Sequence, residues 1–121
     1  MTGEIDTAWE LEVAEFYRSL GIAQGPGDIQ YRLIILVLAK NGVGRLTKFS
    51  EIRNYTDGLI DRGNIGSKMK TVFQLDGLVK RVGRGEYVLT EKGAVAAEFI
   101  QKSSNYYSDI KLTREIIDRF P

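Results

Sequence analysis

The sequence predicts an α+β domain that is mostly helical and contains one small antiparallel β-hairpin. Two observations lead to this fold class. Apolar residues recur at helical spacing through most of the 121 residues. Residues 78–89, by contrast, form two short runs rich in β-branched and aromatic side chains on either side of a glycine-flanked turn. With 43% apolar residues, the chain can build the core of a single domain.

The composition excludes several kinds of chemistry. The chain has no cysteine and no histidine, which excludes disulfides, thiolate nucleophiles and a Ser-His-Asp mechanism. We therefore expect no enzyme activity, no bound metal and no cofactor. No apolar run approaches the roughly 20 residues that cross a bilayer, and the acidic beginning lacks the order of a secretory signal. We expect a soluble protein of the cytoplasm.

Positive charge is concentrated in the middle of the chain, although the formal net charge is only +1. Residues 1–30 contain one basic and six acidic residues. Residues 31–92 contain twelve Lys and Arg against six Asp and Glu, a net charge of +6, and residues 93–121 balance at four against four. A polyanion would respond to this regional field rather than to the total charge.

The first predicted helix begins near Thr7 and ends at Gly21. Thr7 and Glu10 have the spacing of a capping box. Four apolar residues at steps of four, three and four predict one inward face: Trp9, Val13, Phe16 and Leu20. The glycine- and proline-rich residues 23–27 then form a loop.

The second predicted helix covers residues 29–40, with Asp28 as its N-cap and Gly42 after its end. It is apolar nearly all round, so we expect it at the centre of the core. Residues 45–47 are predicted to form a brief strand that pairs with the hairpin, and a short helix follows over residues 48–54.

The next helix is predicted over residues 64–76, with an inward face at Ile65, Met69, Val72 and Phe73 and a stop at Gly77. The connection over residues 55–63 is longer than the three or four residues of a strict helix-turn-helix. Either the preceding helix extends further, or a loop is inserted.

The hairpin is predicted from residues 78–82 and 86–89, with Gly83-Arg84-Gly85 at the reversal and Tyr87 in the core. Thr90 is a suitable cap for a helix over residues 91–102. We expect this helix to break at Ser103-Ser104-Asn105, and a last amphipathic helix to cover residues 109–120.

This order of elements, and the stretch LDGLVKRVGRGEYVLTEKG at residues 75–93, resemble the winged helix-turn-helix DNA-binding family, whose loose pattern is GL(V/I), a hairpin, then Y.LT.KG. The similarity extends in a broad sense to prokaryotic and archaeal transcriptional regulators of the MarR and PadR type. It covers residues 28–102, about 60% of the chain. Residues 1–27 and 103–121 would then be additions to the winged-helix domain.

The resemblance implies sequence-specific binding to double-stranded DNA, with residues 64–76 as a recognition helix in the major groove and residues 80–87 as a wing on the minor groove or backbone. The implied contacts from the recognition helix are Asn64, Ser67, Lys68, Lys70, Thr71 and Gln74, with Gly66 leaving room for close approach. Those from the wing are Lys80, Arg81 and Arg84. Arg45 and Lys48 are expected to anchor a flanking phosphate.

The two flanking helices either complete the core or form the interface of a homodimer, and the resemblance favours the homodimer. A two-fold dimer would place two recognition helices about one DNA turn apart. The resemblance therefore implies a cytoplasmic, nucleoid-associated transcriptional regulator, for which no small-molecule effector is identified. The alternative is a winged-helix module that binds other proteins and no DNA. Gly83-Arg84-Gly85 lacks the spacing of a nucleotide-binding loop.

Overall fold

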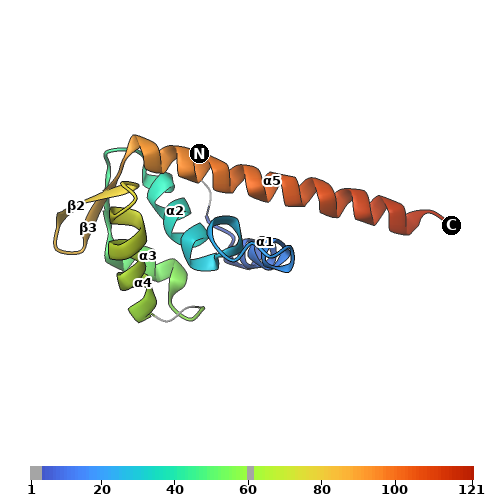
Figure 1. Cartoon of the computed structure of the whole chain (residues 1–121), viewed down its shortest axis with the longest axis horizontal. Coiled ribbons are helices and arrows are strands. Elements are labelled where there is room, and N and C mark those ends of the chain that lie inside the picture. The colour runs from blue at the N-terminus through green and yellow to red at the C-terminus, as the bar shows by residue number, and fades with distance from the viewer. Residues whose placement is uncertain (1–3, 60–61) are drawn as a thin grey trace.

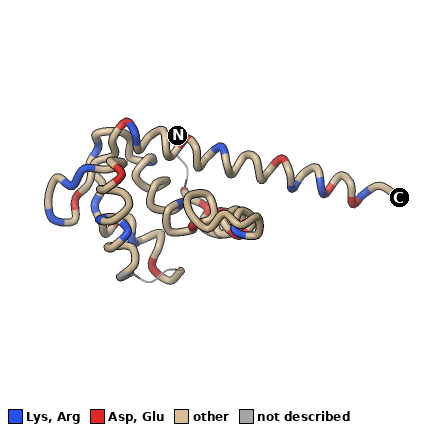
Figure 2. Tube along the Cα trace, in the orientation of Figure 1, with Lys and Arg blue, Asp and Glu red and all other residues tan. Residues whose placement is uncertain are grey.

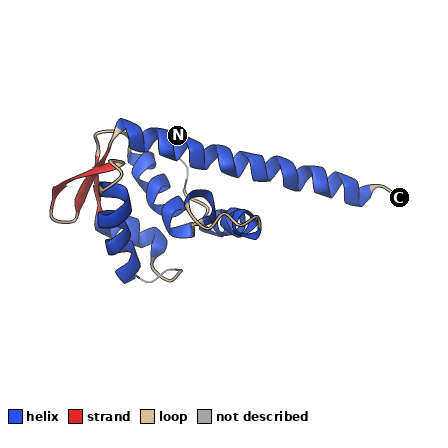
Figure 3. Ribbon diagram, in the orientation of Figure 1, coloured by secondary structure: helices blue, strands red, loops and turns tan. Residues whose placement is uncertain are grey.

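The computed structural model describes residues 4–59 and 62–121, and it is a mostly helical α+β fold with a three-stranded antiparallel sheet (Figures 1 and 3). The fold class expected from the sequence is confirmed at this level. The elements are, in order, α1 (Thr7–Ser19), η1 (Gly25–Gly27), α2 (Ile29–Asn41), β1 (Leu46–Lys48), α3 (Phe49–Thr56), α4 (Arg62–Lys68), η2 (Met69–Gln74), β2 (Val79–Gly83), β3 (Glu86–Leu89) and α5 (Glu91–Arg119).

The sheet has the order β1-β3-β2, so the second strand of the hairpin lies in its centre. Tyr87 of β3 pairs with Thr47 on one side and with Arg81 on the other. The expected pairing of a short strand with the hairpin is therefore confirmed, one residue later than predicted. The backbone N–H of Phe49 donates to the Gly85 carbonyl (2.8 Å), which ties the start of α3 to the hairpin turn.

Helix α2 is the centre of the core, as its apolar sequence predicted. Five of its aliphatic side chains have no exposed surface: Leu33, Ile34, Ile35, Val37 and Leu38. The Asp28 carboxylate accepts from the backbone N–H of Gln30 (2.9 Å), which confirms the expected N-cap. Gly42, with φ of +97°, allows the chain to leave the helix in a conformation that other residues rarely adopt.

The polar beginning of α1 differs from the prediction. The N-cap is Asp6, whose carboxylate accepts from the backbone N–H of Trp9 (3.0 Å), and Thr7 is the first helical residue. Glu10 therefore does not complete a capping box and is buried instead. Leu20, expected on the inward face, lies after the end of the helix and is exposed.

Of the two flanking helices, α1 completes the core of its own chain through its inward face. Val13 has no exposed surface. The rings of Trp9 and Phe16 lie 5.4 and 4.8 Å from that of Tyr107 on α5. This helix therefore packs onto α2 and α5 of its own chain.

Helix α5 is continuous over 29 residues, so the predicted break at Ser103-Ser104-Asn105 is wrong. The two serines accept hydrogen bonds from other helices: Ser103 Oγ from Arg32 (2.8 Å) and Ser104 Oγ from Trp9 Nε1 (2.6 Å). Serine disfavours a helix interior because its hydroxyl competes for local backbone groups. Here those hydroxyls also bind neighbouring helices, so the helix continues and its end extends away from the body (Figure 1).

The connection that was too long for a strict helix-turn-helix is shortened because α3 extends to Thr56, two residues beyond the expected end. Residues 57–61 join it to α4, and residues 60–61 lie outside the described part. The helix predicted over residues 64–76 is α-helical to Lys68 and then a π-helix over η2. Ile65, Met69 and Phe73 are fully buried and four residues apart, and the wider π turn keeps them on one face.

The hairpin and α5 pack in close contact at Gly93. A Cβ at Gly93 would overlap the carbonyl oxygen of Leu78 and the side chain of Leu89. Thr90 caps the same helix by accepting from the Gly93 N–H (3.0 Å). Thr90 therefore begins α5, and Gly93 allows its first turn to pack directly against the hairpin strands. Within the described residues, no helix is both long and apolar enough to cross a membrane.

Candidate functional site

The hairpin presents three cations to solvent. Lys80, Arg81 and Arg84 are exposed, and none makes an ion pair with a described residue. Arg84 and Gly85 form the turn between β2 and β3, and Gly85 has φ of +67°. The side chain at the turn is thus held at the tip of a short, paired ribbon, while its guanidinium has no acceptor within the described chain.

The helix formed by α4 and η2, here called the α4–η2 helix, presents a polar face. Asn64, Ser67, Lys70 and Thr71 are exposed, and Gln74 is half-buried. The Thr71 hydroxyl donates to the Ser67 carbonyl (2.8 Å), which fixes its rotamer along the helix. A Cβ at Gly66 would have only the Phe49 ring in reach, at 4.0 Å, so this face is open at that point.

The structure brings the hairpin and the α4–η2 helix together. Strand β2 contacts η2. Arg45 and Lys48, which flank or belong to β1, are exposed, and Lys48 lies opposite Glu86 in the register. Figure 2 shows the Lys and Arg positions of the hairpin and of the neighbouring segments at one end of the molecule, opposite the C-terminal end of α5. Of the seven Lys and Arg residues among the predicted contacts, six lack an ion-pair partner among the described residues.

Lys68 is the exception. It is half-buried, and its ammonium forms an ion pair with the Asp28 carboxylate at the start of α2. Asp28 was predicted as a cap and Lys68 as a DNA contact, but their pairing was not predicted. They are 40 residues apart, and no local pattern connects them.

A second feature that the sequence reasoning missed is the buried ion pair of Arg32 and Glu10. Arg32 has no exposed surface, and its Nε donates to Glu10 Oε1 (2.8 Å). Its Nη1 donates to the Pro26 carbonyl (3.1 Å) and to Ser103 Oγ (2.8 Å). Burial raises the pKa of the Glu10 carboxyl, and the Arg32 guanidinium opposes that shift. The available signal was an arginine directly before the apolar run of residues 33–39.

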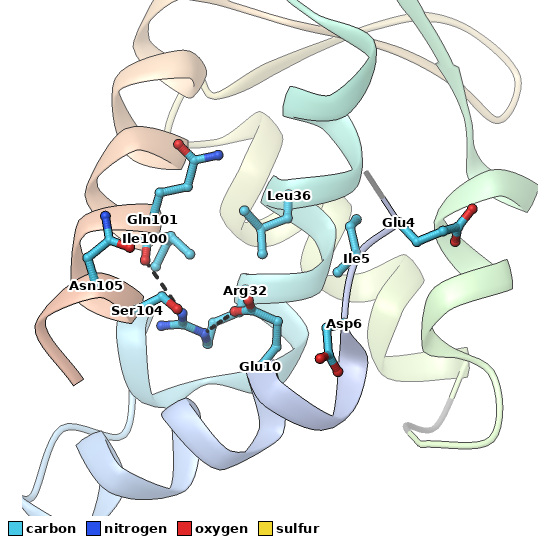
Figure 4. A pocket seen from close by; sticks show the side chains of 10 residues that line it. All are labelled: Glu4, Ile5, Asp6, Glu10, Arg32, Leu36, Ile100, Gln101, Ser104 and Asn105. Atoms are coloured by element: carbon cyan, nitrogen blue, oxygen red, sulfur yellow. Dashed lines mark hydrogen bonds and ion pairs between the residues drawn. The ribbon is translucent and has the colours of Figure 1, made fainter. Parts of the chain in front are cut away.

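This ion pair forms the floor of an open cleft of about 350 Å³ between α1, α2 and α5 (Figure 4). Glu4 and Asp6 stand at its rim, and the Arg32 guanidinium is already occupied by its partners. The cleft therefore offers carboxylates and no free cation. Across the described residues, no three acidic side chains are placed to hold a metal ion.

The far half of α5 and its C-cap carry an exposed, mostly apolar row, here called the α5 stripe. Its members fall at steps of four, three, four and three: Tyr106, Ile110, Thr113, Ile117 and Phe120. Ile117 is 63% exposed and Phe120 is 72% exposed. Beyond Lys111, the described chain makes no hydrogen bond or ion pair between α5 and another element. The cause is geometric, since α5 extends past α1 (Figure 1).

Comparison with protein-family models, with curated proteins and with solved structures finds no match to this chain.

Proposed function

We propose that this protein is a winged helix-turn-helix regulator that binds double-stranded DNA in a sequence-specific manner. One observation carries the proposal: the unpaired cations of the β2–β3 hairpin lie beside the exposed polar face of the α4–η2 helix, at one end of the molecule. A duplex phosphate backbone is the ligand that matches several free Lys and Arg side chains around a helix.

In this proposal the α4–η2 helix enters the major groove and the hairpin is the wing, on the minor groove or the backbone. Asn64, Ser67 and Thr71 are placed to meet base edges or phosphates, and Gln74 extends the same row. Lys70, Arg45 and Lys48 supply phosphate contacts. The hydrogen bond from the Phe49 N–H to the Gly85 carbonyl fixes the start of α3 relative to the wing tip, so that both approach the duplex together.

The partner proposed for the α5 stripe is a second copy of the chain. Steps of four and three are the spacing of a helix that pairs with another helix. Asp109 and Arg114, of opposite charge, flank the stripe and line the same open depression of about 400 Å³. Two copies can therefore pair Asp109 of one chain with Arg114 of the other. A two-fold dimer presents two DNA-binding ends to one pseudo-palindromic site.

The test measures binding to mixed-sequence duplexes by fluorescence anisotropy over a salt series. We expect binding at about 50 mM salt and an affinity that falls steeply as salt rises. The wing variant R81A/R84A should bind more weakly and with a salt dependence about two units smaller. The matched control R18A/R119A removes the same charge from exposed positions away from this end and should leave the slope unchanged. No binding by the wild-type protein, or affinity independent of salt, would refute the proposal.

The exposed α5 stripe also fits a protein-interaction module that does not bind DNA, which is the alternative function. The two functions are distinguished by the triple variant K68A/K70A/R84A in the cell. A regulator loses its activity in this variant, whereas an interaction module that uses α5 retains it.

A further inference from the structure

Among the described Lys and Arg residues predicted to contact DNA, Lys68 alone has a charge that is already paired. Its ammonium contacts Asp28 Oδ2, and both side chains are about one-fifth exposed, at 21% and 20%. The other oxygen of the same carboxylate accepts from the backbone N–H groups of Gln30 (2.9 Å) and Tyr31 (3.4 Å). Asp28 is thus fixed to the start of α2, and the positive end of that helix stabilises its charge.

The ion pair lies at the junction between the α-helical and the π-helical part of the α4–η2 helix. Lys68 is the last residue of α4, directly before the π turn of η2. Behind the helix at this level lies a cavity of about 300 Å³, bounded by Gln24 and Gly25 at the start of η1, by Val72 of the helix and by Asp76 just beyond its end. The helix is therefore not closely packed there. Besides the shared apolar core, two specific contacts join the helix to the start of α2. They are the Asp28–Lys68 ion pair and the stacked rings of Tyr31 and Phe73, whose centroids are 5.1 Å apart.

We infer that Asp28 is a positioning residue for DNA recognition, an inference that rests on the proposed function. By holding the Lys68 ammonium against α2, Asp28 sets the position of the α4–η2 helix and keeps Lys68 away from the phosphates. Lys70, two residues along and exposed, makes the phosphate contact from this helix. Lys68 thus acts in sequence discrimination through the helix that it holds.

Asp28→Asn is the sharpest variant, because asparagine caps a helix about as well as aspartate but has no negative charge to form an ion pair with the ammonium. It releases Lys68 as a free cation beside the duplex. We expect the slope of log affinity against log salt to become steeper by about one unit. The ratio of affinity for a selected duplex over a scrambled duplex should fall, because the helix is held less firmly.

Two further variants separate charge from position. Lys68→Met removes the ion pair without adding a free cation, so the salt slope should stay as in the wild type while the selected-to-scrambled ratio falls. Lys70→Met should reduce the slope by about one unit. The double variant D28N/K68M should behave like K68M. A K68M slope reduced as in K70M, or a D28N slope equal to that of the wild type, would overturn the inference.

A measurement without DNA tests the positioning itself. Amide hydrogen exchange of residues 69–74 should be faster in both D28N and K68M than in the wild-type protein, while exchange in α5 stays the same. Unchanged exchange in η2 overturns the inference even if the protein binds DNA as proposed. Faster exchange in a protein that binds no duplex would instead support the positioning role of Asp28 in the fold and refute the proposed function.

Discussion

Arg32 and Arg84 show how differently the two sides of this molecule use the same side chain. Arg32 is fully buried and donates to Glu10, Pro26 and Ser103, so that one guanidinium joins α1, α2 and α5. Arg84 is exposed at the hairpin tip and has no ion-pair partner among the described residues. A buried cation with all its partners inside the chain holds the fold together, whereas an exposed cation without partners is available to another molecule.

The largest effect is expected from Arg32→Met. It removes every hydrogen bond of the buried guanidinium and leaves Glu10 without its partner, which should lower the free energy of unfolding by about 3–5 kcal/mol. Urea denaturation measures this loss. Arg18→Met, an exposed arginine on α1, should change stability by less than about 0.5 kcal/mol. The double variant R32M/E10L should regain much of this stability. A comparable loss in R18M would contradict the difference between a buried, paired arginine and an exposed one.

Next in size is the effect of Ile117→Asp on association. Burying an isoleucine side chain is worth about 1.5–3 kcal/mol, and a two-fold dimer buries two of them. We therefore expect the dissociation constant of the proposed dimer to rise about 100-fold or more, as measured by analytical ultracentrifugation. Leu112→Asp makes the same change on the opposite side of α5 and should have little effect. Equal dissociation in both variants would show that the α5 stripe is not the interface.

Gly93, at the packed start of α5, and Gly66, on the open face of the α4–η2 helix, should respond in opposite ways to alanine. Gly93→Ala places a methyl group against the Leu78 carbonyl and the Leu89 side chain, and should destabilise by about 1–3 kcal/mol. Gly66→Ala meets open space and should stabilise the helix by up to about 1 kcal/mol, while weakening binding to a duplex. Thermal unfolding and anisotropy measure the two effects, and a destabilised G66A would contradict the open face.

The smallest effect concerns the acids of α1. Lys111 and Tyr107 donate to Glu12 and lower the pKa of its carboxyl below the ordinary value of 4.5. A lowered pKa in the folded state adds stability above pH 4.5 that is lost as pH falls through the folded-state pKa. The stability difference between wild type and Glu12→Gln should therefore shrink as pH falls from about 7 to about 3.

Glu10 is the opposite case, because burial raises the pKa of its carboxyl. Its contribution is present below pH 4.5 and is lost as pH rises through the folded-state pKa. Urea denaturation of E10Q across the same pH series should accordingly show a trend of opposite sign. The same trend in both variants would remove the distinction between the buried and the exposed carboxylate.

Much of the secondary structure was predictable because it follows from neighbouring residues. Asp28 before an apolar run, Thr90 before α5 and Gly77 after η2 act on backbone groups within a few positions. The hairpin followed from its short β-rich runs and its glycine-flanked turn. The free cations of the proposed site were predictable in the same way, since side chains at a hairpin tip have few neighbours to bind.

Only the tertiary structure decided what each polar residue binds across long stretches of chain. The serines of α5 are helix breakers by local preference, yet Arg32 and Trp9 donate to them and the helix continues. Lys68 looks like any helix-surface lysine until Asp28 is brought beside it. The sequence alone therefore determined the order of the helices and strands and several of their caps, because those signals act within one or two turns. It left open which charges are paired and which are free, because that depends on residues that only folding brings together.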